Sequence, residues 1–92
     1  MALLDDDQIS EKLKTLDGWQ RKGEEIVREF KFDDFVGSVK FVDAVVEPAE
    51  RMAHHPDIAI SWNTVTVSIS THSEGGLTAA DFELASRIDA LA

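Results

Sequence analysis

The sequence predicts an α+β fold of two layers, a four-stranded antiparallel sheet with three helices on one face. Three stretches place apolar residues at helical spacing, four shorter stretches are extended, and their order is α-β-β-α-β-β-α. An antiparallel sheet with its helices on one face is the simplest assembly for that order. Because the chain has only 92 residues, we expect residues 1–92 to form a single domain.

The first helix is predicted between an acidic run and a glycine. Asp6 or Asp7 is suited to cap its N-terminus, and Gly18 to end it, since glycine readily adopts the left-handed conformation. Its apolar face repeats at helical spacing and consists of Ile9, Leu13 and Leu16.

A β-hairpin is predicted next. Residues 19–21 read as a short strand, residues 22–24 as its turn, and residues 25–32 as a longer strand in which the two faces alternate. Ile26, Phe30 and Phe32 share one face, so this strand is expected to be half-buried.

The second helix is predicted from a cap at Asp33 or Asp34 to about Ala53. Its main apolar stripe is Phe35, Val39, Val42, Val46 and Ala49, widened by Phe41, Val45 and Met52. A face this broad indicates burial on two sides. Either the helix is simply a valine-rich core element, or part of this face meets a second subunit, which would stabilise a small domain.

Two strands and a helix complete the prediction. Ile58, Ile60 and Trp62 alternate in a third strand that ends at a tight turn. The fourth strand spans residues 64–72 and alternates throughout, with valine and isoleucine on one face and hydroxyl side chains on the other.

His72 is expected at the end of this fourth strand, on its open, hydroxyl-rich face. After a loop, Thr78 is predicted to cap the last helix, and Asp81 stands at the position that completes a capping box.

Composition excludes several classes of function. The chain has 18 acidic and 9 basic residues and a formal net charge of −9, so neither nucleic acid nor an anionic membrane is an expected partner. It has no cysteine, which rules out disulfides and thiolate chemistry. It also lacks an apolar run of membrane-spanning length and a signal-peptide pattern at Met1. We therefore expect a cytoplasmic protein.

Three histidines and a glutamate are the candidate catalytic residues. Glu50 precedes His54 by four residues, so the two would share a helix face, and the carboxylate could fix the tautomer of the imidazole. His55 could line another wall of the same cavity, and His72 would supply a second acid–base group. The structural alternatives are a surface ion pair, a polar helix end and a solvated strand end.

Metal binding is the competing chemical interpretation, because imidazole and carboxylate are common metal ligands. Adjacent histidines rarely bind one ion, and the H-E-x-x-H pattern is absent, so no metal site is predicted. A nucleophilic serine motif and a glycine-rich phosphate loop are also absent.

One spaced pattern resembles the signature of the pterin-4a-carbinolamine dehydratases. It runs Glu50-x-x-x-His54-His55-Pro56, five residues, Trp62, nine residues, His72, eight residues and Asp81. The similarity extends from about residue 18 to the C-terminus, and only the first helix is matched loosely.

The resemblance implies a four-stranded antiparallel sheet with three helices on one face, assembled as a homodimer or homotetramer. It implies dehydration of 4a-hydroxytetrahydropterin to quinonoid dihydropterin and water, which recycles the cofactor of aromatic amino-acid hydroxylases. The family uses no metal and no organic cofactor for this reaction.

The same resemblance assigns roles to residues. His54 and His72 resemble the acid–base pair, and Glu50 resembles a carboxylate that supports the site. Asp81 matches the last motif position as a supporting residue. The substrate-binding positions are His55, Ser70, Thr71 and Trp62.

Two departures concern fine contacts with the substrate. Ser73 stands where animal members of the family have Glu, and Ala53 stands where Asp is common. Two alternatives to an active dehydratase remain: a binding or assembly protein that keeps the fold, as some relatives do, and a metal-binding domain.

Overall fold

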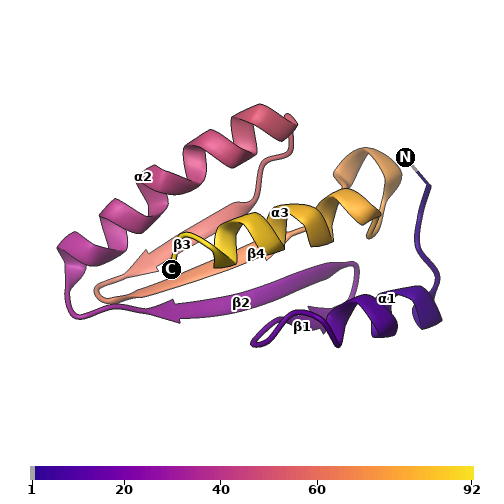
Figure 1. Cartoon of the computed structure of the whole chain (residues 1–92), viewed down its shortest axis with the longest axis horizontal. Coiled ribbons are helices and arrows are strands. Elements are labelled where there is room, and N and C mark those ends of the chain that lie inside the picture. Colours follow the sequence, from indigo (N-terminus) through magenta and orange to yellow (C-terminus); the bar gives the residue numbers. More distant parts are fainter. Residues whose placement is uncertain (1) are drawn as a thin grey trace.

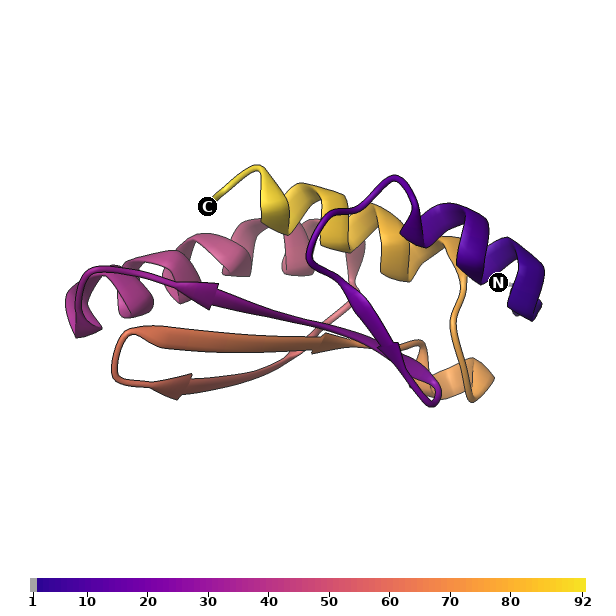
Figure 2. The same ribbon diagram turned by 90° about the horizontal axis from the view of Figure 1, so that it is seen from below.

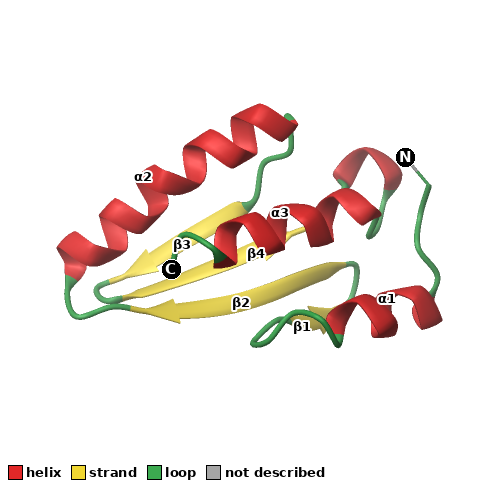
Figure 3. Ribbon diagram, viewed as in Figure 1, coloured by secondary structure: helices red, strands yellow, loops and turns green. Residues whose placement is uncertain are grey.

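The computed structural model describes residues 2–92 and contains three α-helices and one four-stranded sheet (Figures 1 and 3). In chain order the elements are α1 (Asp6–Leu13), β1 (Gln20–Lys22), β2 (Glu25–Lys31), α2 (Phe35–Met52), β3 (Asp57–Ser61), β4 (Thr64–Ile69), a short 3₁₀ turn (His72–Glu74) and α3 (Ala79–Asp89).

The strands pair in the order β1-β2-β4-β3, and every neighbouring pair is antiparallel. Seen along the sheet, the helices lie on one side and the other side is left uncovered (Figure 2). The predicted fold class is therefore confirmed, including the order of its seven elements.

The core lies between the sheet and the helices. The buried side chains of the two central strands include Ile26, Phe30, Val65, Val67 and Ile69. They meet Phe41 and Val45 of α2 and Leu84 and Ile88 of α3. On the uncovered face of β4 the hydroxyl side chains are only half-buried, as the alternation predicted.

Helix α2 is buried on one side only within this chain. Phe41, Val45 and Ala49 are buried, whereas Phe35 and Val46 of the predicted main stripe are 55% and 57% exposed. The predicted main stripe is therefore divided, because Ala49 is buried and Val42 packs against the core while Phe35 and Val46 face outward.

Both boundary predictions for the first helix were wrong. Asp5, rather than Asp6 or Asp7, caps α1, and its carboxylate accepts from the backbone N–H of Gln8 at 2.8 Å. Helix α1 ends at Leu13, before Gly18, because tighter turns follow, in which the backbone N–H of Thr15 donates to the carbonyl of Lys12.

Strand β4 is also shorter than predicted, since it ends at Ile69 rather than at His72. Thr71 forms an isolated bridge with Gly76, and the chain then turns sharply. Among residues 2–92, none of the helices combines the length and the apolar character that crossing a bilayer demands.

Candidate active site

One end of the molecule gathers most of the predicted site residues. Helix α2 ends there, β3 begins, β4 ends and α3 begins, at the right-hand side of Figure 1. Because β3 and β4 are antiparallel, the first residue of β3, Asp57, pairs with Ser68 near the end of β4. The two histidines after α2 and the one after β4 therefore come to the same end of the sheet.

Ala53 directs the two adjacent histidines to opposite sides. It ends α2 in the left-handed conformation, with φ 50° and ψ 42°, and its backbone N–H still donates to Glu50. The chain leaves the helix axis at this residue. His54 turns inward and is buried, whereas the side chain of His55 is 64% exposed.

His54 is held by a carboxylate from another helix, α3. Its Nε2 lies 2.5 Å from Oδ1 of Asp81, which is fully buried at the start of α3. The other oxygen of Asp81, Oδ2, accepts from the Thr71 hydroxyl and from the backbone N–H of Thr78, each at 2.8 Å. A charged group so deeply buried is stabilised by such paired hydrogen bonds and by the N-terminus of α3.

Glu50 does not hold His54, so the predicted Glu50–His54 pair is wrong. Oε2 of Glu50 lies 2.5 Å from Nε2 of His55 instead. The reason is the left-handed Ala53, since the i, i+4 relation requires a helix that continues to His54. The side chain of Glu50 is 67% exposed to solvent and that of His55 is 64% exposed.

His72 opens the 3₁₀ turn that follows β4, and its side chain is 73% exposed. Its Nε2 lies 3.9 Å from Oδ2 of Asp57, a residue that the sequence did not single out. Together with Ser70, His72 lines a cavity of about 320 Å³ between the β1–β2 turn and the loop after β4. Neither His54 nor His55 is among the residues that line it.

The remaining predicted residues fall in different surroundings. The side chain of Thr71 is buried in the network around Asp81, whereas Ser70 is half-buried and faces the cavity beside His72. Trp62 stands in the β3–β4 turn, at the far end of these strands from the histidines, and is 67% exposed. Within one chain Trp62 is thus separated from the other site residues.

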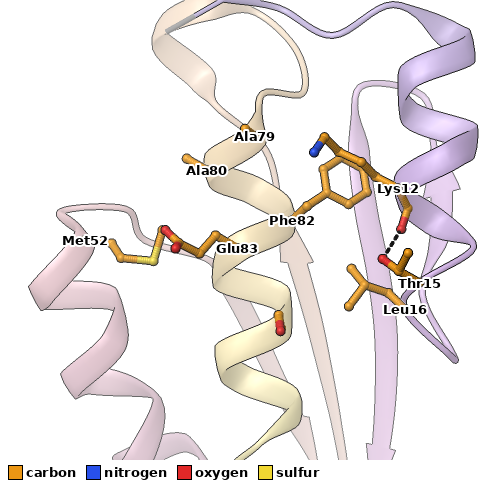
Figure 4. A pocket seen from close by; sticks show the side chains of 9 residues that line it. Lys12, Thr15, Leu16, Met52, Ala79, Ala80, Phe82 and Glu83 are labelled. Carbon is orange, nitrogen blue, oxygen red and sulfur yellow. Dashed lines mark hydrogen bonds between the residues drawn. The ribbon is translucent and has the colours of Figure 1, made fainter.

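A larger cavity lies away from this chemistry. It has a volume of about 820 Å³ and lies between α1, α3 and the end of α2, with Lys12 and Phe82 on one side and Met52 and Glu83 on the other (Figure 4). None of the predicted site residues lines it.

The sequence indicated Asp81 but not its main contact. The spacing of Thr78 and Asp81 predicted a capping box, and the structure contains it. Its contact with His54 joins residues 27 positions apart, which no local pattern reveals. In residues 2–92, no group of three or more acidic or histidine side chains is arranged to hold a metal ion.

Comparison with known proteins identifies the family of this chain. The family model described as pterin 4 alpha carbinolamine dehydratase matches residues 2–91. A Nocardia farcinica protein that bears the name of this dehydratase is 51% identical over 90 residues, covering 98% of this chain and 95% of that protein. One from Thermosynechococcus vestitus is 48% identical over 84 residues, covering 91% and 88%.

Two solved structures are also similar. A transcriptional coactivator/pterin dehydratase from Brucella melitensis superposes with a TM-score of 0.95 and 38% identity, covering 99% of both chains. A pterin dehydratase-like protein described as a RuBisCO assembly factor in the alpha-carboxysome superposes with a TM-score of 0.64 and 26% identity, covering 79% of this chain and 84% of that one. With nearly the whole sequence matched by the family model, this chain belongs to the pterin-4a-carbinolamine dehydratase family.

Proposed function

We propose that this protein dehydrates 4a-hydroxytetrahydropterin to quinonoid dihydropterin and water, and so recycles a tetrahydropterin cofactor. The observation that carries the proposal is the buried pair of His54 and Asp81 at the end of the fold that also holds His72. A fixed imidazole and a solvated one are suited to proton transfer at neutral pH.

The reaction needs two proton transfers and no redox step. One proton goes to the hydroxyl group that leaves C4a as water, and one departs from N5 as the ring forms its new double bond. In our proposal His54 and His72 share these two transfers, so that one histidine ends protonated and the other neutral before they re-equilibrate with solvent. Positioned acid–base groups contribute roughly 10²–10⁴ in rate.

Substrate binding is assigned to the surroundings of these histidines. Ser70 borders the cavity beside His72, and His55 presents an exposed ring that Glu50 orients. We assign the pterin to this region because its polar ring edge needs donors and acceptors of this kind. The site needs no metal and no organic cofactor for this chemistry.

We also infer that the protein assembles as a homodimer or homotetramer, most simply through the exposed apolar stripe of α2. Phe35, Val36 and Val46 are each more than half exposed, and they lie on a helix whose opposite side is in the core. A row of large apolar side chains at this exposure is typical of an interface.

Loss of the absorbance of 4a-hydroxytetrahydropterin tests the proposed activity. We expect the wild-type protein to accelerate this loss, and His54→Ala and His72→Ala each to lower the rate by about 10²-fold or more. Thr66→Val is the control, since Thr66 lies on the uncovered face of β4 outside the site. Unchanged rates in both histidine variants would refute the mechanism.

A second candidate function is assembly of another protein. The exposed side of α2 favours it, and so does the similarity to a relative described as a RuBisCO assembly factor. A stoichiometric protein partner that both histidine variants retain, together with an absence of dehydratase activity in the wild type, would favour this role over catalysis.

A further inference from the structure

The hydrogen-bond donors around Asp81 are divided unevenly between its two oxygens. Oδ1 receives one contact, from Nε2 of His54, whereas Oδ2 receives two, from Thr71 and Thr78. All of these groups are buried, and Asp81 is 0% exposed. The carboxylate therefore cannot rotate without leaving buried donors unsatisfied.

The directions of these hydrogen bonds follow from the chemistry of the groups. A carboxylate only accepts, so the hydroxyl of Thr71 must donate to Oδ2. Oγ1 of Thr71 lies 2.8 Å from Oγ1 of Thr78 and must then accept the proton of that hydroxyl. Thr78 in turn accepts from the backbone N–H of Asp81 in the capping box, which closes a ring.

This closed set of hydrogen bonds determines which nitrogen of His54 carries a proton. Because Oδ1 of Asp81 can only accept, Nε2 of His54 carries a proton in this contact. Nδ1 makes no hydrogen bond with any of residues 2–92. Among residues 2–92 no fully buried side-chain nitrogen or oxygen lacks a partner, so Nδ1 is not fully buried, in a side chain that is 10% exposed.

We propose that Thr71 and Thr78 lock the Asp81 carboxylate, which holds His54 as the Nε2–H tautomer and leaves Nδ1 as the nitrogen that exchanges protons with the substrate. The inference rests on the proposed dehydratase function and deepens it. It makes Thr71 a positioning residue that acts through Asp81, rather than a residue whose hydroxyl contacts the pterin.

Asp81→Asn tests the lock directly, because an amide offers one acceptor and one donor. Thr71 and Thr78 both donate towards Oδ2, so the amide oxygen should take that position and the NH₂ group should face His54. Nε2 must then accept, and the proton of the neutral ring moves to Nδ1. Nitrogen-15 NMR of the histidine rings distinguishes the two tautomers without any turnover.

We expect Nε2–H in the neutral wild-type ring and Nδ1–H in Asp81→Asn. We also expect a loss of kcat approaching the roughly 10⁴-fold seen when the tautomer of a catalytic His–Asp pair is reversed. A neutral His54 that remains Nε2–H in the variant would overturn the proposal, as would a wild-type ring that carries its proton on Nδ1.

Thr71 is tested by a pair of variants in case Asp81→Asn fails to fold. Thr71→Val should lower kcat about tenfold with little change in KM, and Thr71→Ser, which keeps the hydroxyl, should restore most of the activity. Thr66→Val, on the uncovered face of β4, is the matched control for the same kind of substitution. A Thr71→Val variant with raised KM, unchanged kcat and an unchanged His54 tautomer would make Thr71 a substrate contact and overturn the proposal.

These readouts separate two kinds of failure. If the wild-type protein shows no dehydratase activity, the proposed function fails. The NMR experiment still decides whether the hydrogen bonds around Asp81 fix the tautomer of His54. If activity is present and the tautomer does not respond to Asp81→Asn, the proposed function stands and the lock is refuted.

Discussion

The indole nitrogen of Trp19 lies 2.9 and 3.1 Å from the two carboxylate oxygens of Asp89, 70 residues later in the chain. Arg28 completes the cluster, with Nη1 2.8 Å from Oδ1 of Asp89 and its guanidinium 4.4 Å above the ring of Phe30. These contacts connect the start of the sheet to the end of α3, on the side of the core away from the histidines.

We predict that Trp19→Phe lowers the free energy of unfolding by about 1–2 kcal/mol, because it removes a hydrogen bond to a half-buried carboxylate and some packing. Urea denaturation followed by circular dichroism measures the change. Glu83→Gln, on the exposed side of α3, is the control and should change stability by less than about 0.5 kcal/mol. Equal stability of Trp19→Phe and wild type would show that the cluster adds nothing.

Glu50 is predicted to contribute little to catalysis. Its partner is the solvent-exposed His55, and exposed pairs of this kind are worth about 0.2–1 kcal/mol, or less than about fivefold in a rate. Steady-state kinetics of Glu50→Gln should therefore remain within that range of wild type. A loss as large as that of His54→Ala would instead support the role that the family resemblance implies.

The assembly prediction is tested at the start of α2. Phe35→Glu places a charge in the exposed apolar stripe, and an acid in the first turn of a helix does not weaken the helix itself. We expect light scattering to give a dimer or tetramer for wild type and a smaller species for this variant. Lys40→Glu is the control on the exposed polar side of the same helix. A monomeric wild-type protein would contradict the prediction.

Activity is predicted to be independent of metal ions, because the two proton transfers need only imidazole groups. Full activity in protein dialysed against EDTA is the expected result. A loss of activity that Zn²⁺ or Fe²⁺ restores, and Mg²⁺ does not, would favour the metal-binding alternative.

Reactivity of the histidines should follow their exposure. The side chains of His55 and His72 are 64% and 73% exposed, whereas that of His54 is 10% exposed and paired with Asp81. Diethyl pyrocarbonate followed by peptide mass spectrometry should label His55 and His72 first. Early labelling of His54 would indicate that its environment opens readily in solution.

The sequence predicted the fold because its signals are local. Alternation identified β2 and β4, and the capping residues Asp34 and Thr78 begin α2 and α3 as expected. Element ends were less predictable. Strand β4 was extended to His72 because the alternation continues, but the bridge between Thr71 and Gly76 ends the ladder earlier.

The sequence predicted which residues belong to the site, but not which of them form hydrogen bonds with one another. The spaced motif identified the histidines, yet helical spacing suggested Glu50 as the partner of His54. The actual partner, Asp81, comes from another element, and a contact between α3 and the end of α2 depends on tertiary packing. Trp62 illustrates the same limit, since five residues of β3 carry it away from the histidines.

Ala53 also sets a constraint on the length of α2. The chain leaves the helix at Ala53 with φ 50°. The direction of the His54 side chain therefore depends on the angle around the helix axis at which the last residue of α2 lies. Each residue added to or removed from a helix rotates everything after it by about 100°. A substitution along α2 leaves this rotation unchanged, whereas a single insertion or deletion between its core face and Ala53 would turn His54 away from Asp81.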